Sequence, residues 1–358
     1  MRKYVDWKYV KIKKCYTYFN YILILWGGNT MKIGTFSAST PITALSPITA
    51  LSPNRYARAR RFLATQGVTL VAGNLTGRRD SYRAGSIKER AAEINALIHD
   101  DSLDILMATI GGTNANSVLA MLDYEYLNQH PKTIVGYSDA TAVLLAVQTH
   151  APNCRVIYGP ALVASLGALE SEIVTTTWQN FLTVYRAAPG QAVTEQAPAQ
   201  WTDEAVNWET FEHPKHMHAN TWHYTATPIL TGRLIGGNLN TMYGFFNSPY
   251  FPKLTGNELL FIEDAEKTAA TLEKNFVMLA LAGVFDQISG IILGKHALYD
   301  DQGSGRLPID ILQEVLGDRQ LPIIYDYDSC HTVPMLSTPL GADVRIDAQA
   351  RTVTFSHF

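Results

Sequence analysis

The sequence predicts an α/β protein, with an open parallel sheet in its first half and a mixed α+β unit, richer in strand, in its second half. With 358 residues, of which 47% are apolar, the chain is long enough to form two domains. In the first half, short apolar runs alternate with helical patterns, which is typical of parallel βαβ units. A stretch without sustained periodicity then separates this half from a second group of strands.

The elements of the first half follow from local patterns. A first strand is expected just after Met31, and further strands are expected at 68–71, 104–110 and 133–137. A helix is expected at 87–98, because Ser86 and Glu89 have the spacing of a capping box. After Ser138, apolar residues recur at i, i+3, i+4 and i+7, which indicates one face of a second helix.

The second half begins after a long connection. From about 188 to 228 the chain is rich in Pro, Gly, Gln, Thr and His, and connections of this length are usually linkers or functional loops. Beyond it we expect a helix at 272–281 and strands at 258–262, 288–293, 321–325, 344–346 and 353–355. These patterns divide the chain into an N-terminal extension (1–30), a first domain (31–187), an inter-domain loop (188–228) and a second domain (229–358).

The first thirty residues run from a basic stretch into an aromatic and aliphatic run. This run, from Tyr16 to Trp26, is too short to span a bilayer, and no small-x-small cleavage site follows it. We expect a dispensable extension that precedes a natural start at Met31, with a membrane-proximal N-terminus as the alternative. The duplicated PITALS at 41–52 predicts a local loop expansion, since six residues cannot form a solenoid repeat.

The charge pattern argues against a polymeric or membrane partner. The formal net charge is −3 with both signs interspersed, so there is no basic footprint for nucleic acid and no basic cluster for lipid. We therefore expect a small or medium-sized ligand that is neutral or polar.

Cysteine and histidine spacing argues against a disulfide framework and a structural zinc site. The few cysteines lack CxxC spacing, which favours a reducing compartment and hence the cytoplasm; they are Cys15, Cys154 and Cys330. We expect Cys330 to be a packing residue. A group of histidines in the inter-domain loop fits no zinc motif and is expected to be exposed, binding metal at most adventitiously; its members are His213, His216, His218 and His223.

Ser138 allows two interpretations. It follows the strand at 133–137 and opens a helix, so it is either an N-cap or a nucleophile on a tight strand-to-helix turn. The pattern GYSDA departs from G-x-S-x-G at its last position. A nucleophilic serine needs a base and an orienting acid, and Glu263 and His331 both follow apolar strands closely enough to reach the same sheet edge. The alternatives for these two are a helix cap and a solvated loop histidine.

Several separated motifs resemble the LD-carboxypeptidase family of serine peptidases, and within it the branch of microcin C self-immunity proteins. The motifs are IGGTNANSVLAMLDYEYL (110–127), IVGYSDATAVLLA (134–146), LIGGNLNTMYG (234–244), LLFIEDAEK (259–267), ISGIILGKH (288–296) and CHTVPMLSTPLGADVRID (330–347). Together they extend the resemblance from Met31 to the C-terminus. The resemblance implies an N-terminal flavodoxin-like or Rossmann-like domain, a C-terminal α+β domain with a barrel-like sheet, and a homodimer.

The resemblance also implies a Ser-Glu-His triad in a cleft between the domains, without metal or cofactor. Ser138 would be the nucleophile, His331 the general base and then acid, and Glu263 the carboxylate that holds the imidazole. The oxyanion hole would be formed by the backbone N–H groups of Gly112 and Asp139. A glycine suits that place because the donor must approach the oxyanion without a Cβ in the way.

Departures from the peptidase motifs bear on the substrate. Cell-wall LD-carboxypeptidases typically carry the motif RGGYG where this chain has TIGGTN (109–114). They carry His-Gly-Pro where this chain has YGP (158–160). The missing arginine removes a clamp for a free D-amino-acid carboxylate. Both changes resemble the immunity branch, whose members cut the amide between a peptidyl aspartate and a nucleotide phosphoramidate and so give resistance to the antibiotic.

In that branch, loop aromatics stack on the adenine. Trp201 and Trp208 match its W-x-D-E-x-x-N-W pattern, with packing onto the surface as the alternative, and Lys267 could offer a charge to the phosphate or be solvated. We expect a small peptidyl- or aminoacyl-nucleotide as substrate. The alternative functions are a murein LD-carboxypeptidase that releases D-alanine from tetrapeptides, and a catalytically silent nucleotide-binding module.

Overall fold

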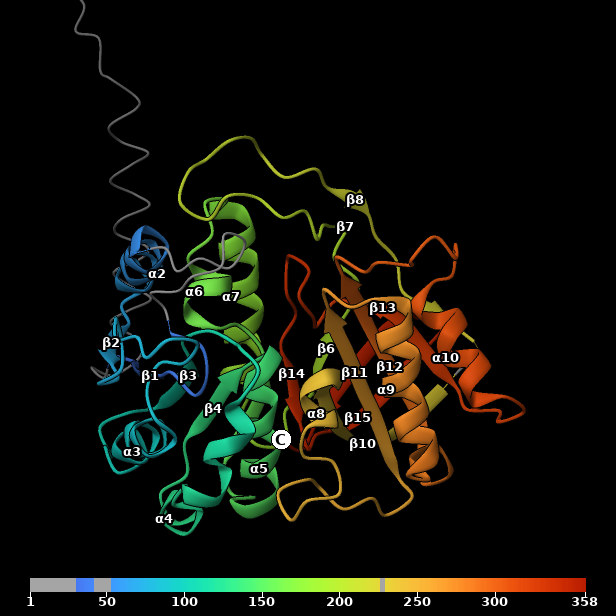
Figure 1. The fold of residues 1–358 in the computed structure, drawn as a ribbon, viewed down its shortest axis with the longest axis horizontal. Coiled ribbons are helices and arrows are strands. Elements are labelled where there is room, and N and C mark those ends of the chain that lie inside the picture. The colour runs from blue at the N-terminus through green and yellow to red at the C-terminus, as the bar shows by residue number, and fades with distance from the viewer. Residues whose placement is uncertain (1–29, 42–52, 226–228) are drawn as a thin grey trace, which may run out of the picture.

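The computed structural model describes residues 30–41, 53–225 and 229–358 (Figure 1). The expectations for the extension at 1–30 and for the duplication at 41–52 lie outside the described residues, apart from the last residue of the one and the first of the other. No helix within the described ranges has the length and apolar character needed to cross a bilayer.

The first half forms the expected parallel sheet, with strand order β14-β5-β4-β3-β1-β2. Its parallel strands are β1 (Lys32–Phe36), β2 (Thr69–Ala72), β3 (Ile105–Ala108), β4 (Thr133–Gly136) and β5 (Arg155–Tyr158). Strand β14 (Thr338–Leu340) comes from the far end of the chain and pairs antiparallel with β5. The C-terminal segment is thereby attached to the first sheet.

Helices cover both faces of this sheet (Figure 1). One layer consists of α2 (Pro53–Thr65), α6 (Leu162–Leu166) and α7 (Ser171–Tyr185), and the other of α3 (Ile87–Ile98), α4 (Tyr124–Gln129) and α5 (Thr141–His150). Alternate strand residues serve the two layers, since Met107 packs with α2, α6 and α7 whereas Leu106 packs with α3 and α5. Burial on both faces explains why these strands are continuous apolar runs.

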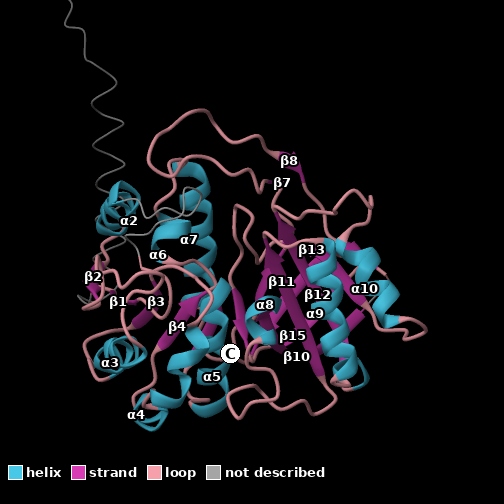
Figure 2. Ribbon diagram, in the orientation of Figure 1, coloured by secondary structure: helices cyan, strands magenta, loops and turns pink. Residues whose placement is uncertain are grey.

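The second half forms a mixed sheet with strand order β6-β16-β15-β10-β11-β12-β13-β9 (Figure 2). Its parallel centre is β10 (Ile229–Asn238), β11 (Glu258–Ala265), β12 (Ile288–Ala297) and β13 (Ile323–Tyr327). The antiparallel strands are β15 (Asp343–Asp347), β16 (Thr352–Ser356), β6 (Val193–Glu195) and β9 (His223–Tyr224). The helices are α8 (Leu239–Tyr243), α9 (Ala269–Leu281) and α10 (Pro308–Leu316).

The expected α/β class and the expected elements of both halves are confirmed. The helix at 87–98 begins at the expected capping box, in which Ser86 and Glu89 bond each other's backbone N–H groups. The inter-domain stretch is mostly irregular and arches from above the first sheet to a small pair above the second, β7 (Gln200–Trp201) with β8 (His218–Ala219) (Figure 1). The boundaries at 187 and 229 stay predictions.

Candidate active site

Ser138 stands on a strained turn at the carboxyl end of β4. Its φ is +58°, a left-handed conformation that non-glycine residues rarely adopt. A short 3₁₀ turn (Ser138–Ala140) leads into α5, and no side-chain cap is present at Tyr137 or Ala140, the N-cap positions of the turn and the helix. Ser138 instead uses its carbonyl oxygen, which accepts from Thr141 Oγ1 at 2.6 Å. The N-cap interpretation therefore loses its support, and the geometry is that of a strand-to-helix nucleophile turn.

The two glycines after β3 lie directly beside this turn. A Cβ on Gly111 would lie 2.8 Å from Ser138 Oγ and 3.6 Å from the Asp139 nitrogen. A Cβ on Gly112, where φ is +152°, would lie 2.1 Å from Ser39 Oγ. The backbone of this loop thus approaches Ser138 only because Gly111 has no side chain, and it approaches Ser39 only because Gly112 has none.

Asp139 organises the same loop through its side chain. The carboxylate is buried, and its Oδ2 accepts from the backbone N–H of Ala115 at 2.9 Å. Burial raises the pKa of Asp139, although hydrogen bonds from Ala115, Ser39 and Asn114 oppose that rise. The residue whose N–H was expected to serve an oxyanion hole therefore also connects the turn at Ser138 to the segment that follows Gly111 and Gly112.

Glu263 is fully buried in β11, opposite Asn238 in the parallel register with β10. The pairing of β11 with β12 shifts register between Ile262 and Asp264, an irregularity of the kind that is often found near functional sites. Gly294 on β12 leaves space for the Glu263 side chain, since a Cβ on Gly294 would lie 2.7 Å from Glu263 Cβ.

A continuous chain of hydrogen bonds joins Ser138 to His331. The Ser138 N–H donates to the Tyr158 hydroxyl at 3.1 Å, and that hydroxyl donates to Glu263 Oε1 at 2.5 Å. Glu263 Oε2 lies 2.7 Å from His331 Nδ1. Asn238 Nδ2 donates to Oε1 at 3.0 Å, so both carboxylate oxygens are engaged.

The electrostatics of this chain favour a basic imidazole. Burial alone would lower the pKa of His331, but the charge and hydrogen bond of Glu263, together with the charge of Asp264, leave that pKa raised. Burial would likewise raise the pKa of Glu263, yet the charge and hydrogen bond of His331, with those of Tyr158 and Asn238, hold it lowered. Burial and the same carboxylate raise the pKa of Tyr158 well above its usual range, so the phenol stays a donor.

Tyr137, the residue before Ser138, contacts the His331 ring. The Tyr137 ring meets the His331 ring edge to face with a centroid distance of 4.9 Å. Cys330, next in sequence, is buried with Sγ 3.0 Å from Thr332 Oγ1, and burial raises its pKa to about 12. This confirms the expectation that Cys330 is a packing residue, because a thiol with that pKa is not a nucleophile near neutral pH.

Lys267 follows β11 at the edge of the same group. Its Nζ donates to the Ala265 carbonyl at 2.8 Å and lies 3.5 Å from Asp264 Oδ1. Its positive charge also opposes protonation of His331. The lysine is therefore half-buried and oriented, and the expectation of a freely solvated side chain does not describe it.

Each of the two loop tryptophans contacts a different basic side chain. The Trp208 ring is covered on one face by the Arg55 guanidinium at 3.8 Å, while Trp201 in β7 has Lys295 Nζ 5.1 Å from its ring centroid. Both are partly exposed. One face of each ring is thus held by a cation of the protein body.

A cavity of about 880 Å³ lies elsewhere, at the amino-terminal edge of the first sheet. It is lined by the first residues of β4 and β5, Thr133 and Arg155, and by the C-terminal Phe358. None of the candidate catalytic residues lines it. Ligands of open α/β sheets bind at the carboxyl ends of strands, where Ser138 lies, so we assign no part of the reaction to this cavity.

Comparison with known proteins agrees with these features. The family model described as the N-terminal domain of LD-carboxypeptidase matches residues 40–159, and the model of its C-terminal domain matches residues 231–346. The chain belongs to the LD-carboxypeptidase family. As a member of this family of serine peptidases, it is a carboxypeptidase-like hydrolase.

Similar members of the LD-carboxypeptidase family include two curated proteins. The "Putative carboxypeptidase" of Vibrio cholerae is 46% identical over 88% of this chain and 92% of its own. The microcin C7 self-immunity protein MccF of Escherichia coli is 41% identical over 90% of this chain and 92% of its own. The solved structure of MccF in complex with aspartyl sulfamoyl adenosine has 40% identity and a TM-score of 0.87, covering 92% of this chain and 97% of that one.

The structure adds two residues that sequence reasoning missed. In the sequence, Tyr158 stands out only as a departure from the family's His-Gly-Pro, and Asn238 occurs only within the motif LIGGNLNTMYG. Gly236 and Gly237 lie within β10, where a Cβ on Gly236 would overlap the Phe261 carbonyl oxygen at 1.8 Å. Their strand brings Asn238 to the Glu263 carboxylate.

Proposed function

We propose that this protein is a serine hydrolase that cleaves the amide between an acidic aminoacyl or peptidyl group and a nucleotide, as in microcin C, and thereby gives self-immunity. One observation carries the proposal. The backbone of a strained serine at the end of β4 is joined, through Tyr158, to the buried Glu263 carboxylate, which holds the half-buried His331. A serine nucleophile in acyl transfer needs a base and an acid that orients the base, and the Glu263–His331 pair supplies both.

In the proposed mechanism, His331 takes the proton of the Ser138 hydroxyl as the oxygen attacks the scissile carbonyl. Glu263 stabilises the imidazolium that forms, because its oxygen is bonded to Nδ1 and leaves Nε2 for the serine. The N–H groups of Gly112 and Asp139 donate to the oxyanion. His331 then protonates the leaving nitrogen, and water hydrolyses the acyl-enzyme by the reverse sequence.

Three solved complexes of MccF support a nucleotide as the leaving group. MccF has been solved with aspartyl sulfamoyl adenosine, with glutamyl sulfamoyl guanosine and, as a tryptophan-to-phenylalanine variant, with adenosine monophosphate. In an active-site mutant of MccF, a serine, an asparagine and a lysine are each replaced by alanine. We assign Ser138 and Lys267 of this chain to such roles, and Trp201 and Trp208 to stacking on the base.

The other two functions have weaker support. A muramoyltetrapeptide carboxypeptidase of Oxalobacter formigenes shares the fold with a TM-score of 0.70, but at 19% identity this likeness carries no substrate. Ile110 also stands where the cell-wall enzymes have the arginine that would bind a D-amino-acid carboxylate. A silent binding module would have no need of a strained serine joined to a basic imidazole.

Mass spectrometry of two substrates in parallel, aspartyl sulfamoyl adenosine and a murein tetrapeptide, tests the proposal. We expect the wild type to release sulfamoyl adenosine, and Ser138→Ala to release none. Ser289→Ala, at an exposed end of β12, is the matched control and should keep full activity. Cleavage of the tetrapeptide alone would assign the protein to cell-wall recycling, and binding without turnover by wild type and Ser138→Ala would leave a silent module.

We further propose a cytoplasmic location and a homodimer. Cys154 and Cys330 are free thiols, which agrees with a reducing compartment. The dimer rests on family resemblance alone. Cell fractionation with an antibody and light scattering of the purified chain test the two statements separately, and a monomer at micromolar concentration would contradict the second.

A further inference from the structure

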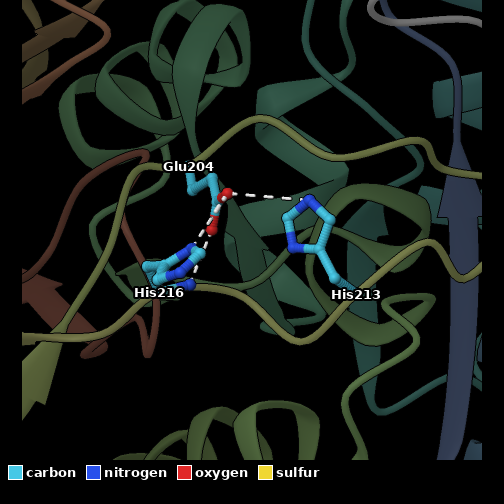
Figure 3. Close-up of side chains that lie close together, drawn as sticks. All are labelled: Glu204, His213 and His216. Atoms are coloured by element: carbon cyan, nitrogen blue, oxygen red, sulfur yellow. Dashed lines mark hydrogen bonds and ion pairs between the residues drawn. The ribbon is translucent and has the colours of Figure 1, made fainter.

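Two histidines of the inter-domain loop converge on one carboxylate (Figure 3). All four loop histidines are exposed, as expected, but His213 and His216 point toward Glu204. Oε1 of Glu204 lies 3.9 Å from His213 Nε2 and 3.5 Å from His216 Nδ1, and the ligand atoms of all three lie within 4.8 Å of one another. The spacing of the residues in the sequence does not indicate this grouping, because Glu204 lies on a different part of the loop from His213 and His216.

The carboxylate is held in place by contacts from the loop itself. Glu204 Oε2 accepts from the backbone N–H of His216 at 2.6 Å, and the Glu204 carbonyl accepts from Lys215 Nζ at 2.5 Å. At the other end, the Glu204 N–H donates to Thr202 Oγ1 at 3.0 Å. These bonds bring the two limbs of the loop together and leave Oε1 facing the imidazoles.

The orientation of His213 adds an independent observation. Its Nδ1 lies 3.0 Å from the Pro214 carbonyl oxygen, so Nδ1 carries the proton that is donated. In the neutral imidazole, Nε2, the atom that faces Glu204, is then the nitrogen with the lone pair. Histidines that bind metals are commonly fixed in this way, with the second ring nitrogen bonded to a backbone carbonyl.

We propose that Glu204, His213 and His216 bind a zinc ion, with water completing a tetrahedral shell. Bonds of about 2.0–2.1 Å in a tetrahedron separate neighbouring ligand atoms by roughly 3.4 Å. The pairs that Glu204 Oε1 makes at 3.5 and 3.9 Å need only small rotations of the side chains to reach that value. Two imidazoles and one carboxylate form a donor set that zinc accepts.

The zinc ion acts as a staple on the loop and takes no part in the chemistry at Ser138. It closes the segment between Glu204 and His216, which contains Trp208. Trp208 is bound to the first domain through Arg55 and through a hydrogen bond from Arg58 to its carbonyl oxygen. Restricting this segment lowers the entropy lost when a base stacks on Trp208. This consequence rests on the proposed nucleotide substrate, whereas zinc binding itself does not.

Calorimetric titration of the metal-free full-length protein with zinc chloride tests the site directly. We expect one ion per chain, with affinity weakened roughly tenfold or more in Glu204→Gln and His216→Ala. Cobalt substitution should give the visible absorption of a tetrahedral centre. His218→Ala is the matched control, since His218 is an exposed histidine of the same loop that lies outside the group. No binding, or equal weakening in His218→Ala, would reduce the site to an adventitious ion only and overturn the proposal.

A second readout distinguishes the restriction of the loop by zinc from zinc binding itself. Zinc should slow proteolytic cleavage within 205–212 and lower the KM for aspartyl sulfamoyl adenosine in the wild type, with neither effect in His216→Ala. Zinc binding with unchanged proteolytic cleavage would show that the ion binds at this site but does not restrict the loop. Because calorimetry and proteolysis need no turnover, a protein that hydrolyses neither substrate would still report on the zinc site.

Discussion

The hydroxyl of Tyr158 donates a 2.5 Å hydrogen bond to Oε1 of Glu263, and both groups are buried. The Tyr158 hydroxyl oxygen also accepts a hydrogen bond from the backbone N–H of Ser138. One phenol therefore connects the backbone of the strained serine to the carboxylate that holds His331. This gives Tyr158 a positioning role, since the hydroxyl sets two members of the site relative to each other.

Tyr158→Phe removes this connection while keeping the ring. A hydrogen bond to a charged group contributes about 1.5–3 kcal/mol, so we expect kcat to fall roughly tenfold to a hundredfold with KM nearly unchanged. Steady-state kinetics on aspartyl sulfamoyl adenosine measure this. Tyr327→Phe is the matched control, because Tyr327 also bonds a buried glutamate, Glu195, outside the chain to Ser138. Equal losses in both variants would mean general destabilisation.

The pH dependence of the reaction should report the Glu263–His331 pair. The base must be neutral, and its pKa is raised above the ordinary 6.5, so kcat/KM should rise with pH along a limb whose midpoint lies above 6.5. Glu263→Gln removes the charge that outweighs burial, so the limb should move to lower pH while the rate at its plateau falls. A limb that keeps its position in Glu263→Gln would show that another group controls it.

Local signals explain which parts of the fold could be predicted. The helix at 87–98 was predictable because its start is encoded within four residues, and both bonds of the Ser86–Glu89 box form. Helix α7 carries no such signal, since SEIVTTTWQNFLTVY is rich in residues that favour strands. Trp178 and Phe181, both buried against the first sheet, make it a helix through packing.

The site shows the same division. Ser138, Glu263 and His331 could be proposed from strand ends and motifs, but Asn238 reaches Glu263 only through the parallel register of β10 with β11. Nothing local encodes that register, because the two strands are paired by tertiary contacts. Tyr158 likewise reaches Glu263 only because the first sheet packs next to the second.

Gly111 should be intolerant of any side chain. A Cβ there would lie 2.8 Å from Ser138 Oγ and 2.9 Å from Ser138 Cβ, so Gly111→Ala must displace the serine or the loop. Overpacking costs about 1–3 kcal/mol of stability, and a displaced nucleophile lowers kcat roughly a hundredfold. Gly244→Ala, whose φ is −76° and whose Cβ would lie no closer than 3.2 Å to a neighbour, is the control. Thermal unfolding and kcat of the two variants are to be compared; wild-type kcat in Gly111→Ala would contradict the close approach.

The loop tryptophans should govern affinity and leave the chemistry unchanged. Arg55 covers one face of Trp208. If the base stacks on this ring as proposed, Trp208→Ala should lose about 1–3 kcal/mol of nucleotide affinity, a roughly tenfold rise in KM with kcat kept. Trp201→Ala should behave alike, since Lys295 supports its ring. Inhibition by adenosine monophosphate gives the same affinity without turnover. Phe211→Ala removes an exposed aromatic ring from the same loop and serves as the control. If Phe211→Ala weakens inhibition as much as either tryptophan variant, the loop acts by general apolar contact and the stacking assignment fails.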